Sequence, residues 1–178
     1  MVTTETWGRR SLFKNDRWAK LLIDTLYHYR GRAYLPDEFV VMPGHIHVLL
    51  TPQTSLEKAV QFIKGGFSVR AKKELGSNME VWQKGFQDHR IRDAGDYAAH
   101  VSYIYNNPVR EKLCERPDQY PYSSAHPGFE LDSVPQGLKP QSSVASDGAA
   151  KAAPLQNNAG SDGAPEGAPL QSKTKAAQ

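Results

Sequence analysis

Residues 39–52 read FVVMPGHIHVLLTP, and this stretch predicts the centre of a β-sheet. Four apolar residues lead into Pro43-Gly44, a dipeptide that is a strong turn signal. The residues after it, HIHVLLT, alternate as expected of a strand with two different faces, and Pro52 ends the run. We therefore predict two buried strands, residues 39–42 and 45–51, that pair as a hairpin.

The segments on the N-terminal and C-terminal sides of this hairpin read as further strands and helices. Residues 2–7 are rich in threonine, which favours a strand, and apolar residues recur at helical spacing over residues 15–28. Ser55 is predicted to cap a long helix that Gly65-Gly66 kinks or loosens in its middle. The apolar side of this helix comprises Leu56, Val60, Ile63, Phe67 and Val69.

A last strand is predicted at residues 81–87, and a last helix follows it. Asp93 is expected to cap that helix, and Pro108 is expected to stop it after Asn107. The order β-α-β-β-α-β-α predicts an α+β fold. Its first six elements match the ferredoxin-like split βαβ pattern, β-α-β-β-α-β, with an antiparallel sheet and an added C-terminal helix.

Length and composition exclude several classes of protein. The chain has 178 residues and one cysteine, Cys114, which excludes a disulfide framework and a zinc site built from several thiolates. No apolar run approaches the ~20 residues that span a bilayer. The first residues, MVTTETWGRRSLF, lack the apolar stretch of a signal peptide. We expect a soluble protein of a reducing compartment, most simply the cytoplasm.

The composition changes near residue 127. Residues 128–178 are dominated by small and polar residues and contain a duplicated segment, SDGAAKAAPLQ from Ser146 and SDGAPEGAPLQ from Ser161. Burial of so few large apolar side chains would not offset the conformational entropy lost on folding. We expect one domain at residues 1–127 and a disordered low-complexity tail at 128–178. The excess positive charge lies in the domain, which suits a polyanionic partner without requiring one.

Two histidines follow the Pro-Gly turn. His45 and His47 are two residues apart on a predicted strand, so both imidazoles project from the same face. That arrangement suits two ligands of one metal ion. An HxH pair taken alone is also consistent with two unrelated polar side chains on a solvated face of a sheet, and this alternative stays open.

The last predicted helix carries a second candidate pair. Tyr103 and Asn107 are four residues apart, so they share a helical face. An amide oxygen is a suitable third ligand beside two imidazoles for Mg²⁺ or Mn²⁺. Tyr105 lies ~200° around the helix from Tyr103 and faces the other side. The alternative is that Tyr103 packs in the core and Asn107 ends the helix before Pro108.

The chain resembles a known superfamily through four of its segments. MPGHIHVLL resembles the His–hydrophobic–His (HUH) signature of single-tyrosine transposases, and FIKGGFSVRAKKEL, WQKGFQDHRIRD and YIYNNPVR follow in the order of that superfamily. The combination is most similar to the bacterial transposases associated with repetitive extragenic palindromes (REP). The resemblance covers residues 2–124.

The resemblance implies a reaction and a set of roles. His45 and His47 are the implied metal ligands with Asn107 as the third, and Tyr103 is the implied nucleophile. The reaction is cleavage and rejoining of single-stranded or hairpin DNA, such as palindromic repeats, through a 5′-phosphotyrosine intermediate with Mg²⁺ or Mn²⁺. The resemblance leaves open whether the protein acts as a monomer or as a homodimer. His100, one turn before Tyr103, is expected either to border the site as a proton shuttle or DNA contact or to have only a surface role.

Basic residues near the later motifs are candidate contacts to DNA phosphates. They are Lys64, Arg70, Lys72, Lys73, Lys84, Arg90 and Arg92. Two other functions remain open: a nucleic-acid-binding module of the same fold whose catalytic site has decayed or that has been domesticated, and a small metallohydrolase. The metallohydrolase ranks last because no carboxylate has a spacing that matches the HxH pair.

Overall fold

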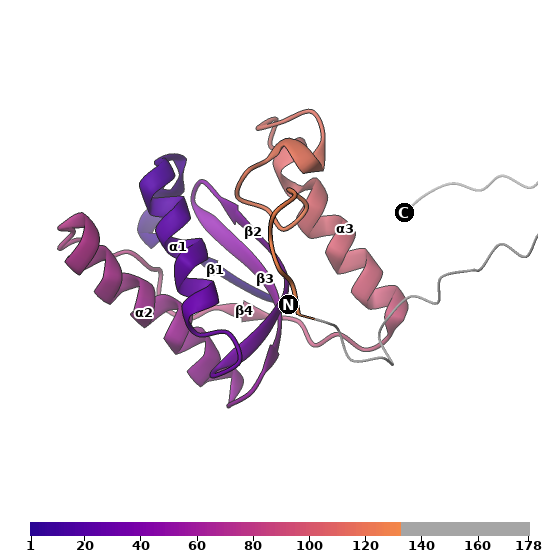
Figure 1. Ribbon diagram of the computed structural model, residues 1–178, viewed down its shortest axis with the longest axis horizontal. Helices are drawn as coiled ribbons and strands as arrows, with labels where there is room; N and C mark the ends of the chain where they lie inside the picture. Colours follow the sequence, from indigo (N-terminus) through magenta and orange to yellow (C-terminus); the bar gives the residue numbers. More distant parts are fainter. Residues whose placement is uncertain (133–178) are drawn as a thin grey trace, which may run out of the picture. The chain divides into compact units, whose positions relative to one another are not determined.

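The computed structural model describes residues 1–132, which form three helices around a four-stranded sheet (Figure 1). No helix in this described part is long and apolar enough to cross a membrane. The main elements are β1 (Val2–Glu5), α1 (Asp16–His28), β2 (Tyr34–Met42), β3 (His45–Pro52), α2 (Leu56–Leu75), β4 (Gln87–Asp88) and α3 (Ala94–Arg110). Three short 3₁₀ helices complete the list, η1 (Trp7–Arg9), η2 (Leu12–Lys14) and η3 (Pro117–Gln119).

The sheet has the strand order β2-β3-β1-β4, and every neighbouring pair is antiparallel. Helices α1 and α2 cover one face of the sheet, and α3 lies against the other face (Figure 1). The prediction of an α+β protein with an antiparallel sheet is thereby confirmed.

Alternation along β3 sorts its side chains between the two faces. Ile46 and Val48 are buried in the core beneath α1 and α2, where Phe67 also packs. The odd-numbered residues of β3 point the other way, so Leu49 joins Ile104 of α3 in a second, smaller core. The histidines of β3 therefore face α3.

The predicted hairpin is present, although β2 is longer than expected. It begins at Tyr34 and carries an irregularity between Pro36 and Glu38. The first half of β2 contains a proline and two acidic residues, which are uncommon in strands, so the sequence does not indicate a strand there. It nevertheless pairs with β3, with Tyr34 opposite Pro52, and the fully buried Tyr34 donates its hydroxyl to the carbonyl of Leu26, 3.0 Å away.

Helix α2 begins at the predicted cap, but it is not broken. The hydroxyl of Ser55 accepts from the amide of Lys58, and the helix is continuous through both glycines. Gly66 is required by packing, since a Cβ atom there would lie 2.7 Å from the hydroxyl of Tyr29. The assignment of Val69 to the apolar side is wrong: its side chain is 68% exposed, because it falls on the face away from Phe67.

The predicted strand at residues 81–87 is mostly irregular. Only β4 pairs as a strand, with one isolated bridge between Thr6 and Trp82. Gly85 adopts φ +73°, a conformation that turns the chain out of an extended path. The Trp82 indole instead packs in the core and donates to the carbonyl of Lys64, 3.0 Å away.

Helix α3 starts at the predicted cap, where the carboxylate of Asp93 accepts from the amide of Asp96. Pro108 does not stop it, and the helix ends at Arg110. A proline so close to the C-terminus removes a single backbone hydrogen bond. The amide of Glu111 still donates to the carbonyl of Asn107, so the last turn closes around the proline.

The first residues of the expected tail belong with the folded part. Phe129 packs against Tyr27 and Phe39, and Asp132 forms an ion pair with Arg30 at 2.9 Å. A lone aromatic residue just past the compositional change gives no periodic signal, so the sequence boundary falls at 127. The remainder of the predicted tail, residues 133–178, lies outside the described residues.

Candidate functional site

His47 occupies the centre of the sheet face that α3 covers. Strand pairing sets it opposite Thr3 of β1, and the Thr3 hydroxyl lies 2.8 Å from Nδ1 of the imidazole. The side chain is 4% exposed, and no group among residues 1–132 hydrogen-bonds to its Nε2. A buried nitrogen of this kind normally has a partner, so Nε2 is positioned to serve as a ligand.

His45 stands next to His47, as the strand period requires. The two ring centroids are 4.9 Å apart, with the rings nearly perpendicular. The hairpin end that carries His45 is fixed because the hydroxyl and the amide of Thr6 both donate to the carbonyl of Gly44. A Cβ at Gly44 would lie 2.8 Å from the carbonyl oxygen of Arg9, so this close approach needs glycine.

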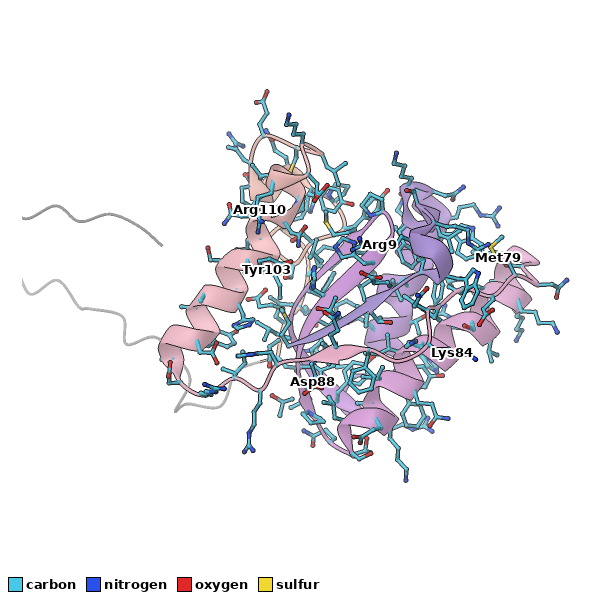
Figure 2. All side chains as sticks on the ribbon, turned by 180° about the vertical axis from the view of Figure 1, so that it is seen from behind. Arg9, Met79, Lys84, Asp88, Tyr103 and Arg110 are labelled. Carbon is cyan, nitrogen blue, oxygen red and sulfur yellow. The ribbon has the colours of Figure 1, made fainter. Side chains whose placement is uncertain are left out.

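Tyr103 comes to the histidines from α3. Its ring centroid lies 5.1 Å from that of His47 at an interplanar angle of 78°, and the side chain is 37% exposed. The guanidinium of Arg110 lies 5.6 Å from the centre of the phenol ring. Figure 2 shows both residues on α3. The structure therefore brings Tyr103 together with the two predicted metal ligands.

Asn107 is buried one turn after Tyr103, with 6% of its surface exposed. Tyr105, the neighbouring tyrosine, lies elsewhere: it packs in the second core and its hydroxyl contacts Glu38. Burial and the negative charge of Glu38 raise the pKa of Tyr105. The two tyrosines thus have separate surroundings, and only Tyr103 adjoins a histidine of β3.

The electrostatics keep both histidines uncharged. Burial and the neighbouring His45 lower the pKa of His47 to about 3. Burial and the positive charge of Arg9 lower the pKa of His45. Neutral imidazoles hold the lone pairs that a cation needs, and when Nε2 of His47 is the ligand, Nδ1–H donates to Thr3. The unpartnered Nε2 and this donor set fit a divalent cation.

A polar cavity of about 410 Å³ opens beside His45. Arg9, Lys14 and Glu111 line it, together with the Pro43-Gly44 turn. Neither Arg9 nor Lys14 was singled out by sequence reasoning, because the segment between β1 and α1 has no periodicity. The sequence could have indicated Arg110, because it lies seven residues after Tyr103 and therefore on the same helical face.

The basic residues predicted on α2 lie across the sheet from Tyr103. Lys64 donates to the backbone carbonyl of Gln83 at 2.7 Å, and burial lowers its pKa. Arg70 forms an ion pair with Glu74, also at 2.7 Å. The structure does not bring these two side chains to the candidate site, nor those of Lys72 and Lys73 in the last turn of α2.

The other predicted contacts lie outside α2. Lys84 belongs to the irregular segment before β4, and it lines a shallow cavity with Thr3 and Glu5. Arg90 and Arg92 lie between β4 and α3, where the amide of Arg92 donates to the carboxylate of Asp96.

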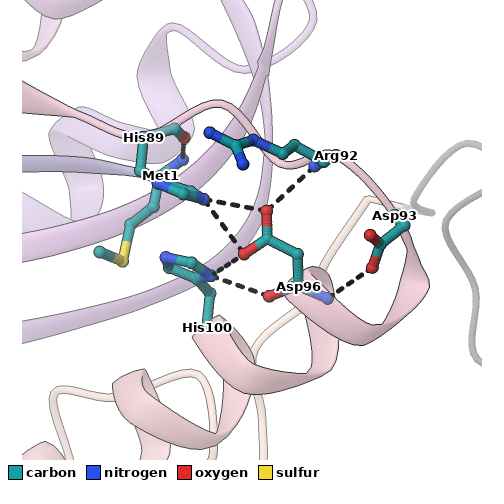
Figure 3. Close-up of polar contacts among 6 residues, drawn as sticks. All are labelled: Met1, His89, Arg92, Asp93, Asp96 and His100. Carbon is teal, nitrogen blue, oxygen red and sulfur yellow. Dashed lines mark hydrogen bonds and ion pairs between the residues drawn. The ribbon is translucent and has the colours of Figure 1, made fainter.

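Three further side chains converge at the start of α3 (Figure 3). The carboxylate of Asp96 lies 2.9 Å from Nε2 of His89 and 3.0 Å from Nδ1 of His100. The two imidazoles stack, with centroids 4.3 Å apart. This cluster has the residue types and spacing to hold a metal ion. Sequence reasoning found only His100, although the four-residue step from Asp96 to His100 predicts their contact.

Comparison with known proteins gives the class of the chain. No model of a protein family matches it. A Haemophilus influenzae protein assigned to the REP-associated tyrosine transposases is 30% identical over 154 residues, covering 74% of this chain and 88% of the relative. The REP-associated tyrosine transposase of Escherichia coli K12 is 28% identical over 141 residues, covering 78% and 79%.

A solved structure supports the same fold. It is that of a REP-associated tyrosine transposase bound to a REP hairpin, with a TM-score of 0.58 and 23% identity, covering 79% of this chain and 91% of that one. The chain belongs to the family of REP-associated tyrosine transposases.

Proposed function

We propose that this protein cuts and rejoins one strand of DNA through a covalent bond to Tyr103. The observation that carries the proposal is the contact between the rings of His47 and Tyr103, with the unpartnered Nε2 of His47 buried beside it. The substrate is single-stranded or hairpin DNA, such as the REP hairpin in the solved relative. The strand order β2-β3-β1-β4 agrees with a split βαβ core to which α3 adds the nucleophile.

Tyr103 supplies the nucleophile. Its phenol oxygen attacks the scissile phosphorus, forms a 5′-phosphotyrosine and releases a 3′-hydroxyl. The ester formed is comparable in energy to the one broken, so a 3′-hydroxyl can reverse the step and join strands. At 37% exposure the phenol is accessible to a DNA backbone, which a core tyrosine is not.

His45 and His47 would hold a divalent cation, Mg²⁺ or Mn²⁺, with the amide oxygen of Asn107 as a third ligand. When bound, such an ion polarises the scissile phosphate and stabilises charge on the leaving oxygen. Thr3 fixes the ring of His47 and leaves Nε2 as its ligand atom. Burial keeps His47 uncharged at neutral pH, so protons do not compete for this nitrogen.

Three basic side chains near the site would hold the DNA backbone. Arg9 and Lys14 line the polar cavity beside His45, and Arg110 lies against the ring of Tyr103. In Figure 2, Arg9 lies in η1, which follows β1, and Arg110 lies on α3. A strand that enters the cavity would place one phosphate near Tyr103 while these charges contact its neighbours. Lys84, Arg90 and Arg92 remain candidates for contacts further along the DNA.

The test is a cleavage assay with a labelled REP hairpin that carries single-stranded flanks, in Mn²⁺, read on a denaturing gel. The wild type is expected to give a label that migrates with the protein. Tyr103→Phe is expected to bind the hairpin and give no such adduct, whereas Tyr105→Phe forms it. A wild type that binds but never forms an adduct would instead be a decayed binding module. Cleavage that survives in Tyr103→Phe would indicate a hydrolase.

A further inference from the structure

The cluster of His89, Asp96 and His100 lies one helical turn from Tyr103, and none of its members belongs to the proposed metal site. The side chains of Asp96 and His100 are largely enclosed, at 20% and 19% exposed, whereas that of His89 is 39% exposed. The carboxylate of Asp96 also accepts from the backbone amide of Arg92 at 3.0 Å. Asp96 is therefore held from several directions, and it in turn orients both imidazoles.

The hydrogen bonds of His100 determine which of its ring nitrogens carries the proton. Nδ1 lies 2.8 Å from the backbone carbonyl oxygen of Asp96, as well as 3.0 Å from its carboxylate. A carbonyl oxygen only accepts, so Nδ1 carries a hydrogen and is not a metal ligand in this arrangement. In the neutral ring the lone pair is then on Nε2, which Figure 3 shows on the side of the ring away from Asp96.

His100 and Tyr103 face a common space. They line a surface hollow of about 230 Å³ together with Met1 and Ala99. Residues three apart on a helix lie on the same face, so the imidazole and the phenol are neighbours along α3. An imidazole held by a carboxylate thus borders the same hollow as the proposed nucleophile.

We propose that His100 accepts the phenol proton of Tyr103 during strand cleavage, and that Asp96 and His89 position it. This rests on the proposed function. The proton moves from the phenol oxygen to Nε2 as the bond from that oxygen to phosphorus forms. The bond from phosphorus to the 3′ oxygen breaks, and that oxygen takes a proton from solvent while His100 later returns its own. A phenol ionises near pH 10, so at neutral pH its attack needs such an acceptor.

Asp96 acts through electrostatics and geometry. Its negative charge stabilises the imidazolium that forms on His100, and its carboxylate, 2.9 Å from a nitrogen of His89 and 3.0 Å from a nitrogen of His100, keeps both rings stacked. The charged or titratable groups that face His100 are Asp96 on α3, His89 before α3 and the Met1 amino group, which donates to the carbonyl of His89.

The experiment measures single-turnover cleavage of the REP hairpin in Mn²⁺ between pH 5 and 9. His100→Ala is expected to cleave about 100-fold more slowly with unchanged hairpin binding, and added imidazole restores part of the rate. His100→Asn keeps a donor toward the Asp96 carbonyl but has no basic nitrogen, so it folds and stays slow. Asp96→Asn is expected to slow cleavage and to change its pH profile, because the protonated imidazole loses its carboxylate. His28→Ala, a histidine at the end of α1, is the control.

The outcomes separate this inference from the proposed function. A wild type that forms the Tyr103 adduct while His100→Ala keeps the same rate and pH profile overturns the role of His100 and leaves the proposed function intact. A slow His100→Ala variant that imidazole does not restore, together with a His100→Asn variant of full activity, shows a structural role and also overturns it. A wild type without any adduct overturns both.

Discussion

The imidazole of His47 lies edge-on to the phenol of Tyr103, with ring centroids 5.1 Å apart. One ring comes from a central strand and the other from a helix that packs on the opposite side of the sheet from α1 and α2. The contact therefore depends on how α3 crosses the sheet, which the buried Ile104 and Leu49 fix. It brings the proposed nucleophile beside a proposed metal ligand.

Cation binding should depend on His47. His47→Ala is expected to lower the affinity for Mn²⁺ at least about 100-fold, because the buried Nε2 is lost. In wild-type protein, Mn²⁺ at about 100 times its dissociation constant should add about 2.7 kcal/mol to the free energy of unfolding. Calorimetric titration and thermal unfolding with and without Mn²⁺ measure the two effects. An equal rise in Tm for His47→Ala would show that the ion binds elsewhere.

The hydroxyl of Thr3 should support that affinity indirectly. Thr3→Val keeps the shape and removes the hydrogen bond to Nδ1 of His47, so Mn²⁺ affinity is expected to fall about 10- to 100-fold. Thr4→Val is the matched control, because the Thr4 hydroxyl is buried with no hydrogen-bond partner among the described residues. Equal affinities for the two variants would contradict the role of Thr3.

The stability of the fold should depend on pH through Asp37. Burial raises the pKa of this carboxyl to about 6. The folded state therefore favours the protonated form, and this contribution to stability is complete below the ordinary value of 3.8 and lost as pH rises through about 6. Asp37→Asn removes the titration. Relative to wild type, it should gain about 2–3 kcal/mol of unfolding free energy between pH 4 and pH 8. Urea unfolding at both pH values tests this, and a constant difference would contradict it.

Replacing each of the two adjacent glycines of α2 by alanine should change the stability of the protein in opposite directions. Gly66→Ala is expected to destabilise the protein by about 1–3 kcal/mol, because its Cβ would overlap the ring of Tyr29. Gly65→Ala meets no atom within 4 Å and should stabilise the helix by about 0.5–1 kcal/mol. Thermal unfolding of the two variants decides the point. A destabilised Gly65→Ala would mean that a kink there is needed.

Basic residues near Tyr103 should contribute to DNA affinity, and those on α2, across the sheet, should not. Arg9→Ala and Arg110→Ala are each expected to weaken hairpin binding. Each is also expected to reduce the slope of log affinity against log salt concentration by about 1. Lys72→Ala, on the far side of the sheet, should bind as wild type does. Fluorescence anisotropy at several salt concentrations measures this. The same loss in Lys72→Ala would indicate that α2 contacts DNA.

The sequence predicted what periodicity and spacing encode. The HxH step places His45 and His47 on one face of β3, and the four-residue step from Tyr103 places Asn107 one turn along α3. These regularities were enough for the class of fold and for the contact of Tyr103 with His47.

Features that depend on tertiary packing could not be predicted. Nothing in the sequence shows that the ammonium of Lys64 donates to backbone carbonyls, or that Gly66 makes room for the ring of Tyr29, which follows α1. Residues 81–87 alternate as a strand does, yet the turn at Gly85 and the burial of Trp82 keep most of this segment out of the sheet. Pro108 reads as a stop, but it lies where the helix loses only one hydrogen bond.

The most direct test is to identify the residue that holds the DNA. Mn²⁺-dependent cleavage of the hairpin, digestion with trypsin and mass spectrometry would examine the peptide of residues 93–110, which contains Tyr97, Tyr103 and Tyr105. Fragmentation is predicted to locate the nucleotide on Tyr103. A nucleotide on either other tyrosine, or an adduct that persists in Tyr103→Phe, would contradict the central claim.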